Sequence, residues 1–149
     1  MNGPGKIRKI LVCDYNKELA GTFCRLFQEE GYEVSVFHDY AEAVRSLPKI
    51  KTDAVLVHLR SGALPDPVES GLQVIRCAKW WIPEAPNFVV TAGNKDCIEP
   101  TVTAGANYIV AIDQNLAEVL ITALERVNQG RIDPRPYVYG WGFKGKWSE

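Results

Sequence analysis

The sequence predicts an α/β fold, a doubly wound parallel sheet of five strands that is followed by an extended C-terminal tail. Short apolar runs of strand length alternate along the chain with segments in which apolar residues recur at helical spacing. The joining segments are short, as in β–α units whose parallel strands are covered by helices on both faces. With 149 residues, 46% of them apolar and 23% charged, the chain has the size of one globular domain. We expect an N-terminal extension at 1–8, a body at 9–130 and the tail at 131–149.

The first three strands are expected at 9–13, 32–37 and 53–59. The third run is apolar and rich in β-branched residues, which is typical of a central strand buried on both faces. Between the first two strands, apolar residues recur every three or four positions until Gly31, which predicts a helix that ends at a glycine. A loop that contains two prolines is expected at 60–69.

Two further helices are predicted around the third strand. A short helix at 41–47 precedes the strand and places its apolar residues on one face. The next helix is expected to begin at Ser70, whose side chain suits an N-cap, and to run to Trp80 and Trp81 before Pro83. Because the two tryptophans are adjacent on a helix, we expect one of them to be exposed and to form a second contact patch or to pack against the prolines.

The second half of the body predicts two more strands and two more helices. The strands are expected at 87–92 and 107–112, and a weak helix between them is expected at 96–103. The last helix, at 116–127, has a continuous apolar face and ends before Gly130. In a doubly wound sheet, ligand sites lie beyond the carboxyl ends of the strands, so residues that end different strands should converge on one rim.

Five segments, in this order, resemble the response-regulator receiver (CheY-like) family over about residues 6–128. They are 9–19, 53–60, 70–75, 88–92 and 104–112. The resemblance implies a flavodoxin-like fold and a receiver-like domain at 9–130. In that family, two acidic residues follow the first strand, an aspartate at the end of the third strand accepts phosphate, and a lysine lies near the end of the fifth.

Matching the family motif to this sequence gives a degenerate phosphorylation pocket. Asp14 takes the first acidic place, Tyr15 the second, and His58 the place of the phosphate-accepting aspartate. Thr91 matches the family's residue whose hydroxyl responds to phosphorylation. In place of the family's lysine stands either Ala111 or Ile112.

Receiver phosphorylation needs a carboxylate nucleophile, a divalent cation held by oxygen ligands, and a cation beside the phosphoryl oxygens. The matched positions lack the nucleophile, one metal ligand and the lysine. We therefore predict a pseudo-receiver with no catalytic residues, no metal and no cofactor, which acts as an interaction module, a signalling adaptor or an accessory subunit. His58 is then a neutral residue that pairs with Asp14, and the hydroxyl of Thr91 bonds locally. The alternative is a switch that responds at His58 to pH, a small ligand or atypical phosphorylation.

The tail at 131–149 holds five of the chain's fifteen aromatic residues. In an extended chain, alternation would place the first four rings on one side, so the segment is expected to leave the body as an arm that docks on a partner protein. Two other uses stay open: the rings can fold back on the domain itself, or stack on single-stranded nucleic acid. These aromatic residues are Tyr137, Tyr139, Trp141, Phe143 and Trp147.

Charge and composition exclude several other classes of function. A net charge of −1 gives no general attraction to nucleic acid, which argues against that partner. No run of 18 apolar residues and no secretory leader is present, so we expect no membrane association and a cytoplasmic protein. The four cysteines form no Cys-x-x-Cys pair and are expected to be reduced. The oligomeric state stays open, homo-oligomers included.

Overall fold

A computed structural model describes residues 6–59, 65–130 and 136–147, with side chains not described for 65–69. Its centre is a seven-stranded sheet in the order β2-β1-β3-β4-β5-β6-β7. All neighbours from β2 to β6 are parallel, and β7 is antiparallel to β6. The strands are β1 (Lys9–Cys13), β2 (Glu33–Phe37), β3 (Ala54–Leu59), β4 (Asn87–Thr91), β5 (Tyr108–Ala111), β6 (Tyr137–Gly140) and β7 (Phe143–Lys146).

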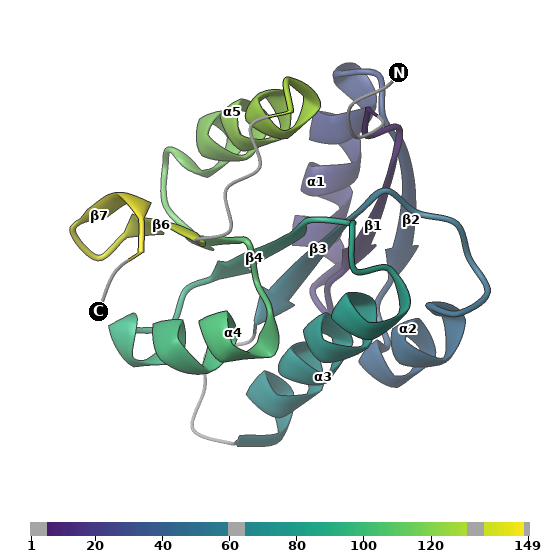
Figure 1. Cartoon of the computed structure of the whole chain (residues 1–149), viewed down its shortest axis with the longest axis horizontal. Helices are drawn as coiled ribbons and strands as arrows, with labels where there is room; N and C mark the ends of the chain where they lie inside the picture. Colours follow the sequence, from purple (N-terminus) through teal and green to yellow (C-terminus); the bar gives the residue numbers. More distant parts are fainter. Residues whose placement is uncertain (1–5, 60–64, 131–135, 148–149) are drawn as a thin grey trace.

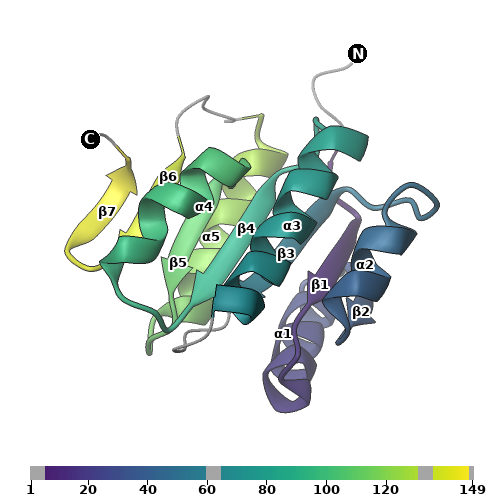
Figure 2. The ribbon, with the colours of Figure 1, turned by 90° about the horizontal axis from the view of Figure 1, so that it is seen from below.

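Helices cover the sheet on both faces (Figures 1 and 2). On one face α2, α3 and α4 contribute to one buried cluster, and on the other face α1 and α5 contribute to a second. A 3₁₀ turn at Lys95–Cys97 leads into α4. The helices are α1 (Lys17–Glu29), α2 (Tyr40–Ser46), α3 (Pro65–Trp81), α4 (Ile98–Ala104) and α5 (Leu116–Asn128). No helix in the described part of the chain is long and apolar enough to cross a bilayer.

The third helix begins earlier than the sequence predicts. It starts at Pro65, so the expected loop at 60–69 is shorter and Ser70 lies inside the helix instead of capping it. Prolines are tolerated in a first helical turn because the N–H that they lack would have no partner there. The prolines at 65 and 67 therefore mark the start of a helix, where we expected them to mark a loop.

The tail forms part of the sheet, so the predictions of exactly five strands and of a separate arm are wrong. β6 adds to the free edge of β5, and the chain then reverses at Trp141 and Gly142 to form β7. Both turn residues have positive φ, 54° and 89°, which is the geometry of a type I′ two-residue hairpin. We call β6, this turn and β7 the hairpin.

The reversal also separates the aromatic side chains that we expected on one side. Tyr137 and Tyr139 pack on the face of the sheet that carries α1 and α5. Trp141, Phe143 and Trp147 pack against the opposite face, which carries α3 and α4. The rings of Phe88, Tyr108 and Tyr137 stack across three neighbouring strands, with centroids 4.8 and 5.3 Å apart. These contacts make the tail a structural part of the domain, the second of the three uses that the sequence left open.

Candidate functional site

The carboxyl ends of the strands bring Asp14 and His58 together at one rim. Asp14 directly follows β1 and is fully buried, and His58 lies in β3, which pairs with β1 and is also buried. The Nδ1 atom of His58 lies 2.8 Å from Oδ1 of Asp14. An ionised carboxylate can only accept, so this nitrogen carries the hydrogen and donates it. The bond fixes the orientation of the imidazole ring.

Asp14 is a shared acceptor for several groups around it. Its Oδ1 also accepts a hydrogen bond from the backbone N–H of Asn16, at 2.9 Å. Its backbone carbonyl accepts from Nδ1 of His38, at 2.9 Å, so both histidines of the chain bond to this one residue. Its second carboxylate oxygen, Oδ2, is buried and has no hydrogen-bond partner among the described residues. Asp14 thus anchors β1, the end of β2 and β3 at the rim.

Two tyrosines enclose His58. The ring of Tyr15 stacks on the imidazole, with ring centroids 5.0 Å apart and planes 20° from parallel. The hydroxyl of Tyr40 donates a hydrogen bond to the backbone carbonyl of His58. Burial raises the pKa of Tyr40 well above its ordinary value, and the nearby Cys13 and Asp14 raise it further, so this hydroxyl stays protonated. Tyr15 is 39% exposed and forms the outer cover of the pair.

The other predicted rim residues lie at the ends of β4 and β5. The Thr91 hydroxyl oxygen accepts a hydrogen bond from the backbone N–H of Gly93, at 3.0 Å, which is a local bond of the kind expected. Ala111 ends β5 and packs against Gly140 of the hairpin. The backbone N–H of Ile112 donates to the carbonyl of Thr91, at 2.8 Å. No group of three or more candidate metal ligands occurs among the residues that the structure describes.

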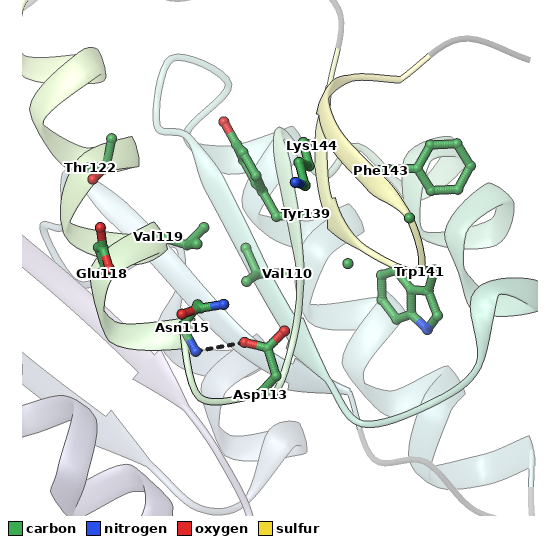
Figure 3. Close-up of a pocket in the computed structure, with 12 residues that line it drawn as sticks. Val110, Asp113, Asn115, Glu118, Val119, Thr122, Tyr139, Trp141, Phe143 and Lys144 are labelled. Atoms are coloured by element: carbon green, nitrogen blue, oxygen red, sulfur yellow. Dashed lines mark hydrogen bonds between the residues drawn. The ribbon is translucent and has the colours of Figure 1, made fainter.

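A groove that sequence reasoning missed lies between α5 and the hairpin (Figure 3). Its volume is about 600 Å³. Val110, Val119 and Tyr139 supply apolar surface, and Asp113, Glu118 and Lys144 supply charges. The groove depends on the tail folding back onto β5, so the expectation of a separate arm hid it. The two glycines that flank Trp141 were the available signal of a chain reversal.

Trp80 and Trp81 are both exposed, where only one was expected to be. Their exposed fractions are 78% and 52%, and they end α3. We call the surface that they form the tryptophan surface. By contrast, Tyr137 is buried and the other tail aromatics are half-buried against the sheet. The structure therefore distinguishes an exposed aromatic surface on α3 from a covered one in the tail.

Solved structures of response regulators share this architecture. A CheY-like receiver domain protein from Methanospirillum hungatei JF-1 aligns with a TM-score of 0.68 at 19% identity, covering 84% of this chain and 97% of that one. The chemotaxis protein CheY4 of Vibrio cholerae aligns with a TM-score of 0.67 at 21% identity, covering 81% and 98%. The fold is that of CheY-like response-regulator receiver domains.

A third receiver structure, a response regulator from Burkholderia pseudomallei, contains a phosphorylated aspartic acid, a calcium ion and citrate. It is 27% identical, with a TM-score of 0.65, covering 88% of this chain and 76% of that one. No protein-family model matches the sequence, and no curated protein matches it. The likeness to receiver domains therefore establishes the fold, and the chemistry of the rim has to be argued from this chain's own residues.

Proposed function

We propose that this chain is a non-catalytic pseudo-receiver that works through protein contacts and independently of aspartyl phosphorylation. The observation that carries the proposal is the 2.8 Å hydrogen bond between Nδ1 of His58 and Oδ1 of Asp14. In our match to the receiver motif, His58 takes the position of the phosphate acceptor, and its imidazole bonds to Asp14, the acidic residue that the motif retains. Asp14 is thereby engaged as a hydrogen-bond acceptor inside the fold.

The neighbouring positions support the same proposal. Receiver chemistry needs hard oxygen ligands for a divalent cation and a positive charge beside the phosphoryl group. Tyr15 stands at the second acidic place, where its ring covers His58, and Ala111 stands at the end of β5. The Cβ of Ala111 faces Gly140 of the hairpin, where a Cβ on Gly140 would collide with it, so the end of β5 is in contact with the hairpin. The local packing thus favours a rim without a phosphorylation site.

The tryptophan surface is our candidate for the protein contact, in place of the tail rings that the sequence favoured. Exposed tryptophans supply large contact area at little conformational cost, and they are enriched at the centres of protein interfaces. Most of the tail's aromatic surface already serves the domain's own packing. We therefore assign partner binding first to Trp80 and Trp81.

Phosphorylation tests the first half of the proposal. We expect the purified chain, incubated with acetyl phosphate and Mg²⁺, to show no phosphoryl adduct by intact-protein mass spectrometry, while an ordinary receiver domain treated in parallel is modified. An adduct mapped to an aspartate or to His58 would contradict the proposal and support the switch that responds at the rim.

Partner capture tests the second half. We expect the wild-type chain to retain a stoichiometric protein from a lysate of its native cells, and the double variant Trp80→Ala, Trp81→Ala to lose it. Tyr15→Ala, which removes another exposed aromatic ring, is the matched control and should retain the partner. Equal retention by the wild type and the double variant would overturn the assignment to the tryptophan surface.

A further inference from the structure

We infer that the tryptophan surface of one chain docks into the groove between α5 and the hairpin of a second copy, so that copies associate head to tail. The inference rests on the proposed function, because it names the partner of the same surface. It commits to one occupant for the groove, an indole ring presented by another molecule of this chain.

The tryptophan surface has the form of a projecting knob. Trp80 and Trp81 lie in the last turn of α3, and they and Tyr15 are the large apolar side chains exposed in the described part of the chain. The residue before them is Lys79, an exposed cation in the same turn. Two adjacent indoles with a neighbouring positive charge need a site that is apolar at its base and acidic at its rim.

The groove has these two properties. Val110 is buried beneath it, and the half-buried side chains of Val119 and Tyr139 complete an apolar base. Glu118 and Thr122 project from α5 along one side of the groove, and Asp113 lies at the end where α5 begins (Figure 3). At about 600 Å³, the groove falls within the range of about 300–1,000 Å³ that is usual for sites that bind small organic groups.

The chemistry of an indole ring matches this lining. Its N–H can donate a hydrogen bond but cannot accept one, so a buried indole needs an acceptor at the edge of its site. The carboxylate of Glu118 is such an acceptor beside an apolar base. The Tyr139 ring offers an aromatic surface, and offset or edge-to-face aromatic pairs add to the gain from burial.

Charge favours the same pairing. The lining carries two carboxylates, Asp113 and Glu118, and one ammonium group, Lys144, which leaves a net charge of −1. Lys79 brings a positive charge with the tryptophans. Charge complementarity of this kind sets the orientation of two surfaces more than it adds affinity.

The positions of the two surfaces make the association head to tail. α3 follows the carboxyl end of β3 and runs back along the sheet, so Trp80 and Trp81 lie at the amino edge. The groove begins where α5 does, at the carboxyl edge and on the opposite face of the sheet (Figure 2). An interface between two different surfaces is heterologous. In a linear assembly of copies, it leaves one tryptophan surface free at one end and one groove free at the other.

Sedimentation velocity over a range of concentrations tests the inference. The predicted contact is small and belongs to the weak class of interfaces, so the average mass should be followed up to about 1 mM protein. We expect it to rise above 16.6 kDa, the mass of one chain. Trp80→Ala, Trp81→Ala on the knob should raise the dissociation constant at least roughly twentyfold, as expected for loss of an interface hot spot. Tyr15→Ala should leave it unchanged.

A mixing experiment separates this contact from every symmetric one. Thr122→Arg fills the groove from an exposed position on α5 and leaves the tryptophans intact. Neither this variant nor the double tryptophan variant should associate alone. Mixed together, they should form a complex of one to one and no larger, with twice the 16.6 kDa of one chain, because one free knob meets one free groove. Circular dichroism of each variant checks that it is folded.

The outcomes distinguish this inference from the proposed function. A wild-type chain that stays monomeric to about 1 mM overturns the inference, and so does a Thr122→Arg variant that associates as strongly as the wild type. In either case, loss of a different protein by the double tryptophan variant in the capture experiment keeps the proposed function. If that variant loses neither self-association nor a protein partner, both are overturned.

Discussion

A Cβ atom added to Gly140 would collide with the Cβ of Ala111, so the tip of the hairpin fits against β5 only because these two residues are small. The contact joins residues 29 positions apart and lies where the hairpin meets the carboxyl rim. It explains how an aromatic tail can become two further strands of the sheet.

Substitution of Gly140 should therefore be costly. Gly140 has φ of 124°, so Gly140→Ala adds backbone strain to the collision with Ala111. Overpacking typically costs about 1–3 kcal/mol and unfavourable backbone conformations about 1–3 kcal/mol, so we expect the free energy of unfolding to fall by roughly 2–6 kcal/mol. Urea unfolding followed by tryptophan fluorescence measures it.

Gly142→Ala is the matched control for this prediction. Gly142 also has positive φ, 89°, but a Cβ there meets nothing within 4 Å. This variant should carry the backbone strain alone and lose less stability than Gly140→Ala. Equal losses in the two variants would show that the contact with Ala111 contributes nothing.

The hydrogen bond between His58 and Asp14 should appear as a coupling energy. Both side chains are buried, so removal of either one leaves a buried polar group without its partner. We expect His58→Ala to lower the free energy of unfolding by about 1–3 kcal/mol, the usual cost of a buried polar group left without a partner. A double-mutant cycle with Asp14→Ala should give a coupling energy of about 1–3 kcal/mol. Each single variant leaves the other side chain buried without its partner, and the double variant removes both side chains.

The cycle also has a result that would contradict the structure. If the two single losses add within about 0.5 kcal/mol, the side chains do not interact, and the oriented imidazole on which the proposed function depends is absent. Thr91→Ala is a comparison at the same rim, since its hydroxyl accepts only a local bond from Gly93. Its coupling with His58→Ala should be near zero.

The sequence predicts the rim well because of a general property of parallel sheets. Apolar runs of strand length locate β1, β3, β4 and β5 to within a residue or two, and the carboxyl ends of parallel strands share one edge. The proximity of Asp14 and His58 follows from those two facts. Their hydrogen bond was expected because a buried imidazole and a buried carboxylate each need a polar partner.

The tail could not be predicted in the same way, because its position is decided by contacts distant in sequence. Alternation of aromatic residues is equally compatible with a free arm and with an added strand. The choice depends on a free edge at β5, on the stacking of Tyr137 against Tyr108, and on the small size of Ala111 and Gly140. A positive φ at Trp141, a residue type that rarely adopts it, hid the turn further.

Removal of the tail should destabilise the body. Val138 is fully buried and Tyr137 nearly so, and their loss would expose Tyr108 and the edge of β5. Burial of a large side chain contributes roughly 1.5–3 kcal/mol, so deletion of residues 136–149 should lower the free energy of unfolding by at least about 3 kcal/mol. Near-ultraviolet circular dichroism and urea unfolding measure the change, with Lys144→Ala, at an exposed position, as the control. A deleted chain as stable as the wild type would support a dispensable arm.

Cys13 should make the domain less stable at alkaline pH. Burial raises the pKa of its thiol far above the ordinary 9.0, and the charges of Asp14 and Asp39 raise it further. In the unfolded chain, the thiol ionises near pH 9. Above that pH the unfolded state releases a proton that the folded state keeps, so the free energy of unfolding falls as pH rises. The contribution is fully present below pH 9 and declines above it.

Comparison of pH profiles isolates the contribution of Cys13. The burial of Tyr40, whose pKa is also raised, adds a similar decline above its ordinary 10.0, but that decline is present with or without the thiol. We therefore compare the wild type with Cys13→Ala by urea unfolding between pH 8 and pH 10. The wild type should lose up to about 1.4 kcal/mol more per pH unit above pH 9 than the variant, the value for one proton.

The variant is less stable at pH 8 because the substitution leaves a cavity, but the cavity lowers the free energy of unfolding equally at every pH and does not change its slope against pH. Parallel profiles would show that the thiol ionises with the same pKa in both states, which its full burial in β1 does not allow.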